Sequence, residues 1–129
     1  MSVRDILHVM VVDDQVTSRM VTVEMLQGLG IRNIHVTKDG REAYNFLSSR
    51  PVHLIISDLY MPDVDGLHLL QAVRAHPKLQ KLGFIIITAR KDQNVMAKAR
   101  QLGVNNVLAK PFDAPVLKHA IESVVGKLA

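Results

Sequence analysis

Short apolar runs recur along this chain, and each ends at a charged, hydroxyl-bearing or turn-forming residue. Runs of this length, bounded by polar residues, are typical of strands that are buried on both faces of a sheet. We therefore predict five strands, at residues 6–12, 34–37, 54–58, 84–87 and 107–109.

Between the strands, apolar residues recur three and four positions apart, which is the spacing of one face of a helix. Thr17 or Ser18 is the expected N-terminal cap of the first helix, and Gly28 and Gly30 are expected to end it. The inward-facing residues predicted from this spacing are Val16, Met20, Val23 and Leu26 in the first helix, Ala43, Phe46 and Leu47 in the second, Leu67, Leu70 and Val73 in the third, Val95, Ala99 and Leu102 in the fourth, and Leu117, Ile121, Val124 and Leu128 in the last.

Strands and helices alternate strictly, with connections of only a few residues. Such alternation predicts an α/β fold: a five-stranded parallel, doubly wound sheet whose right-handed crossovers place helices on both faces. Residues 1–129 are expected to form one domain, which is long enough to bury a substantial core. An open sheet of this kind places its binding site at the carboxyl ends of the strands.

The composition argues against several classes of protein. No apolar run approaches the ~20 residues of a membrane span, and the N-terminus lacks the layout of a signal peptide, so we expect a cytoplasmic protein without membrane insertion. The absence of cysteine excludes disulfides and thiolate metal sites. The net charge is +4, but the basic residues are scattered and aromatic residues make up only 4% of the chain, which argues against a nucleic acid partner. The six histidines show no metal-ligand spacing and are expected to be structural or exposed.

Polar residues follow four of the predicted strands at the point where each ends. Asp13 and Asp14 follow the first, Asp58 ends the third, Thr88 follows the fourth and Lys110 follows the fifth. In a parallel sheet these side chains meet at one edge, where the carboxylates repel one another unless a divalent cation or the lysine offsets their charge. Carboxylates without His or Cys favour magnesium, and a carboxylate, a metal, a lysine and a hydroxyl are the parts that phosphoryl transfer uses.

Together these features resemble the receiver domain of two-component response regulators, and most closely the single-domain chemotaxis (CheY-like) type. The likeness extends over the whole chain and rests on the motifs Val11-Val12-Asp13-Asp14, Asp39-Gly40, Ser57-Asp58, Met61-Pro62, Asp65-Gly66, Thr88-Ala89 and Lys110-Pro111-Phe112. The resemblance implies a flavodoxin-like (βα)5 fold with strand order 2-1-3-4-5. It also implies a monomeric module whose partner is a histidine kinase and whose output is the binding of another protein.

The resemblance assigns roles to the acidic residues. Asp58 would accept a phosphoryl group from a phosphohistidine of the kinase. Asp14, Asp58 and the backbone carbonyl of Tyr60 would bind Mg²⁺ directly, and Asp13 would act largely through water.

It also assigns roles at the ends of the last two strands. Lys110 would hold the phosphoryl oxygens, Thr88 would move to hydrogen-bond them, and the Lys110–Pro111 bond would be cis. Receivers usually carry Tyr or Phe three residues before the lysine, and here that position is Val107. Valine has no ring to turn inward. We therefore predict a muted or rerouted change on the face made by the fourth helix, the fifth strand and the fifth helix.

Two residues beside this edge are unusual in combination. Tyr60 lies two residues after Asp58, and Arg90 lies two residues after Thr88. A phenol screens the path of water, and a guanidinium pairs with phosphoryl oxygens. We predict that they lengthen the lifetime of the phosphoryl group.

Several functions remain open at this stage. A phosphorylated module without enzymatic turnover has two outputs: binding a partner such as a flagellar motor switch protein, or draining phosphoryl groups from a shared kinase as a phosphate sink. An aspartate-nucleophile phosphatase uses similar parts but generally has a second acid where this chain has Tyr60. A flavin binder of the same architecture needs a Ser/Thr/Gly-rich phosphate loop where this chain has Asp13 and Asp14.

Overall fold

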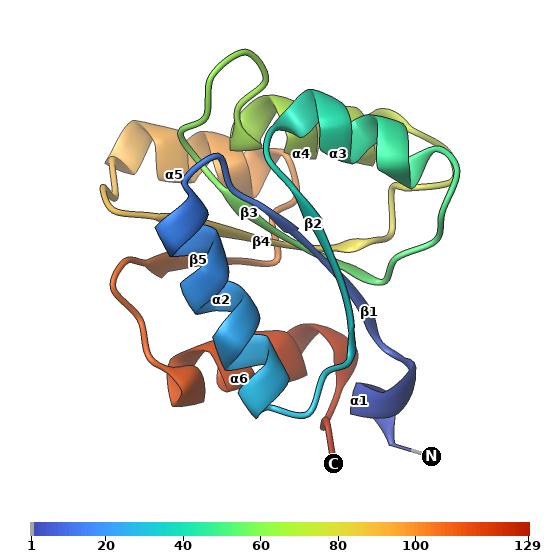
Figure 1. The fold of residues 1–129 in the computed structure, drawn as a ribbon. Coiled ribbons are helices and arrows are strands. Elements are labelled where there is room, and N and C mark those ends of the chain that lie inside the picture. The colour runs from blue at the N-terminus through green and yellow to red at the C-terminus, as the bar shows by residue number, and fades with distance from the viewer. Residues whose placement is uncertain (1) are drawn as a thin grey trace.

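In the computed structural model, which describes residues 2–129, five parallel strands form one sheet in the order β2-β1-β3-β4-β5 (Figure 1). Every neighbouring pair is parallel. The strands are β1 (His8–Val12), β2 (Asn33–Thr37), β3 (Leu54–Asp58), β4 (Gly83–Thr88) and β5 (Asn106–Ala109). The predicted fold class and strand order are therefore confirmed.

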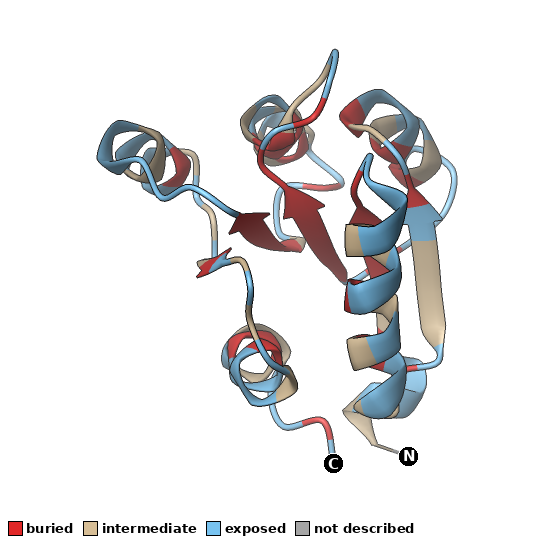
Figure 2. Cartoon of the chain, turned by 60° about the vertical axis from the view of Figure 1, so that its left-hand side comes forward, coloured by how far each residue is buried: buried red, intermediate tan, exposed pale blue. Residues whose placement is uncertain are grey.

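Helices cover both faces of this sheet. They are α1 (Val3–Ile6), α2 (Val16–Gly28), α3 (Gly40–Leu47), α4 (Gly66–Ala75), α5 (Gln93–Gln101) and α6 (Ala114–Val125). Helices α3, α4 and α5 lie on one face, and α2 and α6 lie on the other (Figure 1). The central strands β3 and β4 are buried along their whole length, as their apolar runs predict (Figure 2).

Both chain ends differ from the prediction. Ile6, expected to begin the first strand, ends the short helix α1 and is 53% exposed, and the strand begins only at His8. The Asp5 carboxylate accepts hydrogen bonds from the backbone N–H and the hydroxyl of Ser2, which closes this turn. Leu128, expected in the last helix, is buried but lies beyond the end of α6.

Helix α2 also begins and packs differently from the prediction. Its N-cap is Gln15, not Thr17 or Ser18. Val16 and Met20 were expected to face inward but are 58% and 55% exposed, and the buried residues of the helix are Thr22 and Leu26. The early start has a local cause, because the carboxylate of Asp13 at the end of β1 accepts the Gln15 N–H at 3.0 Å.

Three histidines meet near the amino-terminal end of β1. His8 Nδ1 lies 3.0 Å from His35 Nε2 with the ring planes only 9° apart, and the His8 backbone N–H donates to His53 Nδ1 at 2.9 Å. At this distance the two rings form a hydrogen bond when one ring nitrogen donates and the other accepts. Burial lowers the pKa of His35, and the nearby His8 and Arg50 lower it further.

This arrangement predicts a pH-dependent stability. Below the ordinary histidine pKa of about 6.5 the unfolded chain takes up a proton at His35 that the folded chain resists, so the free energy of unfolding falls as the pH drops below that value. We expect His35→Gln to show a shallower fall between about pH 7 and pH 5 in urea denaturation than the wild type. The matched control is His119→Gln, at an exposed histidine. Equal slopes for His35→Gln and the wild type would contradict the prediction.

Candidate functional site at the carboxyl edge of the sheet

The strand ends bring the polar residues predicted from the sequence to one edge. Asp13 follows β1, Asp58 is the last residue of β3, Thr88 is the last residue of β4, and Lys110 follows β5. Strands β1 and β3 are direct neighbours, so the acids at their ends lie side by side. Lys110 reaches the same acids across the end of β4, to which it is tied by a 2.8 Å hydrogen bond from its backbone N–H to the Thr88 carbonyl.

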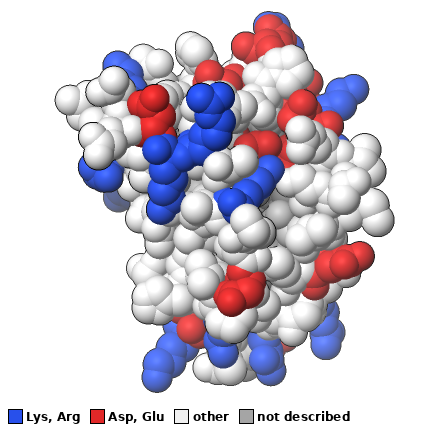
Figure 3. Space-filling model, turned by 90° about the vertical axis from the view of Figure 1, so that its left-hand side faces the viewer, with Lys and Arg blue, Asp and Glu red and all other residues white. Residues whose placement is uncertain are grey.

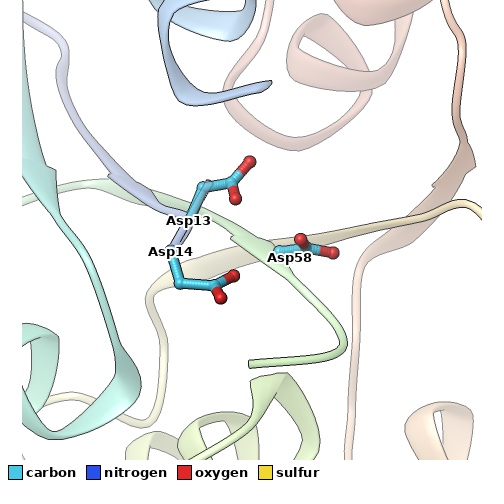
Figure 4. Close-up of side chains that lie close together, drawn as sticks. All are labelled: Asp13, Asp14 and Asp58. Carbon is cyan, nitrogen blue, oxygen red and sulfur yellow. The ribbon is translucent and has the colours of Figure 1, made fainter. Parts of the chain in front are cut away.

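Asp13, Asp14 and Asp58 form an acidic cluster in which one carboxylate oxygen of each lies within 4.8 Å of the others (Figure 4). Asp13 and Asp58 are buried, whereas Asp14 is exposed. Asp13 Oδ2 has no hydrogen-bond partner among the described residues. A buried carboxylate oxygen beside two further carboxylates is unfavourable without a cation. The oxygen-only donor set fits a hard divalent ion such as Mg²⁺.

Lys110 supplies positive charge to this cluster. Its Nζ lies 3.2 Å from Asp58 Oδ2 and 3.7 Å from Asp13 Oδ2, and the Leu59 N–H donates to Asp58 Oδ1 at 2.8 Å. Burial raises the pKa of Asp58 above its ordinary value, Asp13 adds to the rise, and Lys110 and the Leu59 N–H only partly oppose it. The carboxylate is therefore poorly solvated, which favours a bound cation or reaction with an electrophile.

The remaining predicted residues lie on β4 and β5 or in the loops that follow β3 and β4. The Thr88 hydroxyl donates to the Arg90 carbonyl at 3.0 Å and accepts the Arg90 N–H at 3.1 Å, so it is engaged with the following loop. Tyr60 is 51% exposed and Arg90 is also exposed. Val107 is half-buried and packs against the core beneath α3, α4 and α5. The Lys110–Pro111 bond is cis, as the resemblance implies.

Two residues at this edge, Ser18 and Gly66, make close contacts that the sequence analysis did not predict. Ser18, considered in the sequence only as a helix cap, accepts a hydrogen bond from Lys110 Nζ at 2.8 Å. No local signal marks this contact, because the two residues are 92 positions apart. Gly66 belongs to the Asp65-Gly66 motif, but only the structure shows why a glycine is needed at this position. A Cβ there would lie 2.5 Å from the Asp58 carbonyl oxygen and 3.1 Å from Leu59 Cα.

Gly66→Ala is therefore expected to destabilise the protein by about 2–3 kcal/mol, because backbone atoms at the end of β3 must move to admit the methyl group. Urea denaturation measures this loss. Gly28→Ala is the matched control, because a Cβ at Gly28 meets nothing within 4 Å. We expect that variant to be as stable as the wild type or slightly more stable. Similar stability of the two variants would contradict the steric explanation.

The surface around the edge carries both signs of charge. On the face shown in Figure 3, Lys and Arg side chains are interspersed with Asp and Glu. This face therefore presents no continuous basic surface of the kind that binds nucleic acid. Among residues 2–129, no helix is long and apolar enough to cross a membrane.

Comparison with known proteins identifies the family. Residues 9–122 match the model of the response regulator receiver domain. The chain belongs to the response regulator receiver family. The probable chemotaxis protein CheY of Rhizobium etli is 46% identical to this receiver over 128 residues, covering 99% of each chain. Receiver domains of two-component signalling bind Mg²⁺ at an acidic pocket, and the described residues of this chain hold a cluster of Asp13, Asp14 and Asp58 that is compatible with such binding.

Solved structures agree with this assignment. The chemotaxis protein CheY4 of Vibrio cholerae is 26% identical to this receiver, with a TM-score of 0.85 and coverage of 92% of this chain and 98% of that one. The receiver domain of a sensor histidine kinase from Pseudomonas aeruginosa is also 26% identical, with a TM-score of 0.85 and coverage of 94% and 98%. The latter structure is described as having a magnesium ion coordinated in its active-site cleft.

Proposed function

We propose that this receiver takes a phosphoryl group from a histidine kinase onto Asp58 and then signals by binding another protein. One observation carries the proposal: the poorly solvated Asp58 carboxylate lies 3.2 Å from Lys110 Nζ and within the acidic cluster with Asp13 and Asp14. A nucleophile, a cation site and a fixed positive charge are the elements that phosphoryl transfer needs.

In the proposed reaction an Asp58 oxygen attacks the phosphorus of a phosphohistidine. The new O–P bond replaces the N–P bond of the donor, and the imidazole leaves with the bonding electron pair and takes up a proton. Mg²⁺, when bound, neutralises charge on the phosphoryl oxygens. Asp14, Asp58 and the Tyr60 carbonyl would hold the ion, with Asp13 acting through water.

Lys110 acts during the transfer and Thr88 acts after it. The Lys110 ammonium stabilises the negative charge that develops on the transferring group as it reaches Asp58. Thr88 exchanges its hydrogen bonds with Arg90 for one to the phosphoryl group, which shifts the loop after β4. Because Val107 replaces the usual aromatic ring, we expect this shift to spread weakly toward α5, β5 and α6.

The test is phosphotransfer from a radiolabelled, histidine-phosphorylated kinase domain in the presence of Mg²⁺. We expect label to move from the kinase to this protein and to be lost in mild alkali, as an acyl phosphate is. A chelator of divalent ions should stop the transfer. Retention of all label on every candidate kinase, together with no labelling by small phosphodonors, would refute the proposal.

Two outputs follow from phosphorylation, and we favour a role in chemotaxis. The support is the 46% identity to a probable chemotaxis protein over nearly the whole chain. The proposed partners are a chemotaxis kinase and a flagellar motor switch protein. In this proposal residues 1–129 form one receiver domain, which is monomeric and binds both partners in the cytoplasm.

The second candidate function is a phosphate sink, which is favoured by the presence of Val107 where receivers usually have an aromatic residue. Phosphorylation-dependent retention on the switch protein supports the first role, and competition with a second receiver for one kinase supports the sink. Turnover of small phosphate esters would instead indicate a phosphatase.

The exposed Tyr60 and Arg90 lead to a prediction on phosphoryl lifetime. We expect the double variant Tyr60→Ala, Arg90→Ala to lose its phosphoryl group about threefold faster than the wild type, because water reaches the phosphorus more freely and a pairing cation is gone. Decay of purified labelled protein measures the rate. Arg100→Ala, at another exposed arginine, is the control and should decay like the wild type. Slower decay of the double variant would contradict the prediction.

A further inference from the structure

The ammonium of Lys110 has three polar neighbours. Its Nζ lies 2.8 Å from Ser18 Oγ, 3.2 Å from Asp58 Oδ2 and 3.7 Å from Asp13 Oδ2. The shortest of these contacts is to the neutral hydroxyl, although two buried carboxylates compete for the same charge. The two carboxylates attract the ammonium, and the Ser18 hydroxyl adds a third and shorter contact from α2.

Ser18 is well placed to fix a position because its own helix is fastened to the end of β1. The Gln15 N–H donates to Asp13 Oδ1 at 3.0 Å, and Arg19 Nη1 donates to the Asp13 carbonyl at 3.0 Å. The Thr22 hydroxyl donates to the Ser18 carbonyl at 3.2 Å one turn further along α2. The serine hydroxyl is thus held relative to Asp13, one of the acids of the cluster.

The surroundings of the Ser18–Lys110 contact strengthen this hydrogen bond. Ser18 and Lys110 line one groove between α2 and the segment after β5, and Val21, Met25 and Phe112 form much of the rest of its wall. Val21 and Phe112 offer the ammonium no acceptor, and the Met25 thioether is only a weak one. The Thr22 hydroxyl also lines this groove but donates to the Ser18 carbonyl. Hydrogen bonds from a charged group are stronger in such partly dry surroundings than in open solvent.

We propose that Ser18 is a positioning residue, which orients Lys110 Nζ for the transfer of a phosphoryl group to Asp58. The inference rests on the proposed function. It goes beyond it by adding a residue from α2, a helix that the motifs of the sequence did not connect with the lysine. Ser18 acts through Lys110 and not on the phosphorus.

The experiment compares wild type, Ser18→Ala and Ser18→Thr in phosphorylation by acetyl phosphate with saturating Mg²⁺. We expect Ser18→Ala to lower the maximal rate about tenfold, the lower end of the effect of losing one hydrogen bond from a charged group in the transition state. The half-saturating donor concentration and the Mg²⁺ affinity should stay unchanged, because Ser18 contacts neither. Ser18→Thr keeps the hydroxyl and should restore the rate to within about twofold.

Thr17→Ala is the matched control, since it removes an exposed hydroxyl from the same turn of α2. It should react like the wild type. If wild type is labelled and Ser18→Ala is equally fast, the positioning role is wrong and the proposed function stands. If Ser18→Thr or Thr17→Ala is as slow as Ser18→Ala, the loss is structural and the positioning role is wrong. If wild type takes up no label from acetyl phosphate or from any phosphorylated kinase, the proposed function fails.

Discussion

Asp58→Asn is expected to take up no phosphoryl group from any donor that labels the wild type. Asparagine has nearly the same shape, but its amide oxygen is a poor nucleophile and carries no charge to bind a cation. The burial that raises the pKa of Asp58 also means that its negative charge lowers the stability of the folded protein. The variant should therefore be at least as stable as the wild type in the absence of divalent ions. Labelling and urea denaturation measure the two effects.

A second carboxylate provides the control for this variant. Asp63 is exposed, pairs with Arg41 at 3.0 Å and has a positive φ of 69°, a conformation that asparagine tolerates well. Asp63→Asn should accept phosphoryl groups at the wild-type rate. Label on Asp58→Asn at a level near that of the wild type would show that another residue is the acceptor.

Lys110→Ala is expected to slow phosphorylation by about a hundredfold or more, because the transferring group loses the fixed positive charge nearest to Asp58. The same change should tighten Mg²⁺ binding, since the ammonium lies 3.2 Å and 3.7 Å from two of the acids and repels a cation placed among them. Slower chemistry with tighter metal binding is a combination that simple unfolding does not produce. Phosphorylation kinetics and isothermal titration with Mg²⁺ measure the two changes.

Lys110→Arg separates charge from geometry. It keeps the positive charge, so Mg²⁺ affinity should remain near that of the wild type. The broad, planar guanidinium does not fit the contacts of the lysine Nζ with Ser18 and Asp58, so phosphorylation should stay slow. Weaker Mg²⁺ binding in Lys110→Ala would mean that the lysine supports the metal site, contrary to this account.

The carboxyl-edge site illustrates which parts of a receiver can be predicted from sequence. Asp13, Asp58, Thr88 and Lys110 each follow an apolar run, and the ends of parallel strands share an edge, so their convergence follows from pattern and topology together. Ser18 lies on a helix, and the side of a helix that faces a given strand end depends on how the helix packs. No pattern in the sequence near Ser18 predicts that orientation.

The sequence by itself determined the number of strands, the parallel sheet and the edge at which the polar residues gather. It did so because burial on both faces demands continuous apolar runs, a signal that each strand carries alone. Tertiary structure alone decided that Met20 faces solvent, that His8 lies within hydrogen-bonding distance of His35, and that Ser18 reaches Lys110. Each of these depends on the distance and rotation between elements far apart in the chain. Those quantities follow from the packing of the whole core, which no single segment encodes.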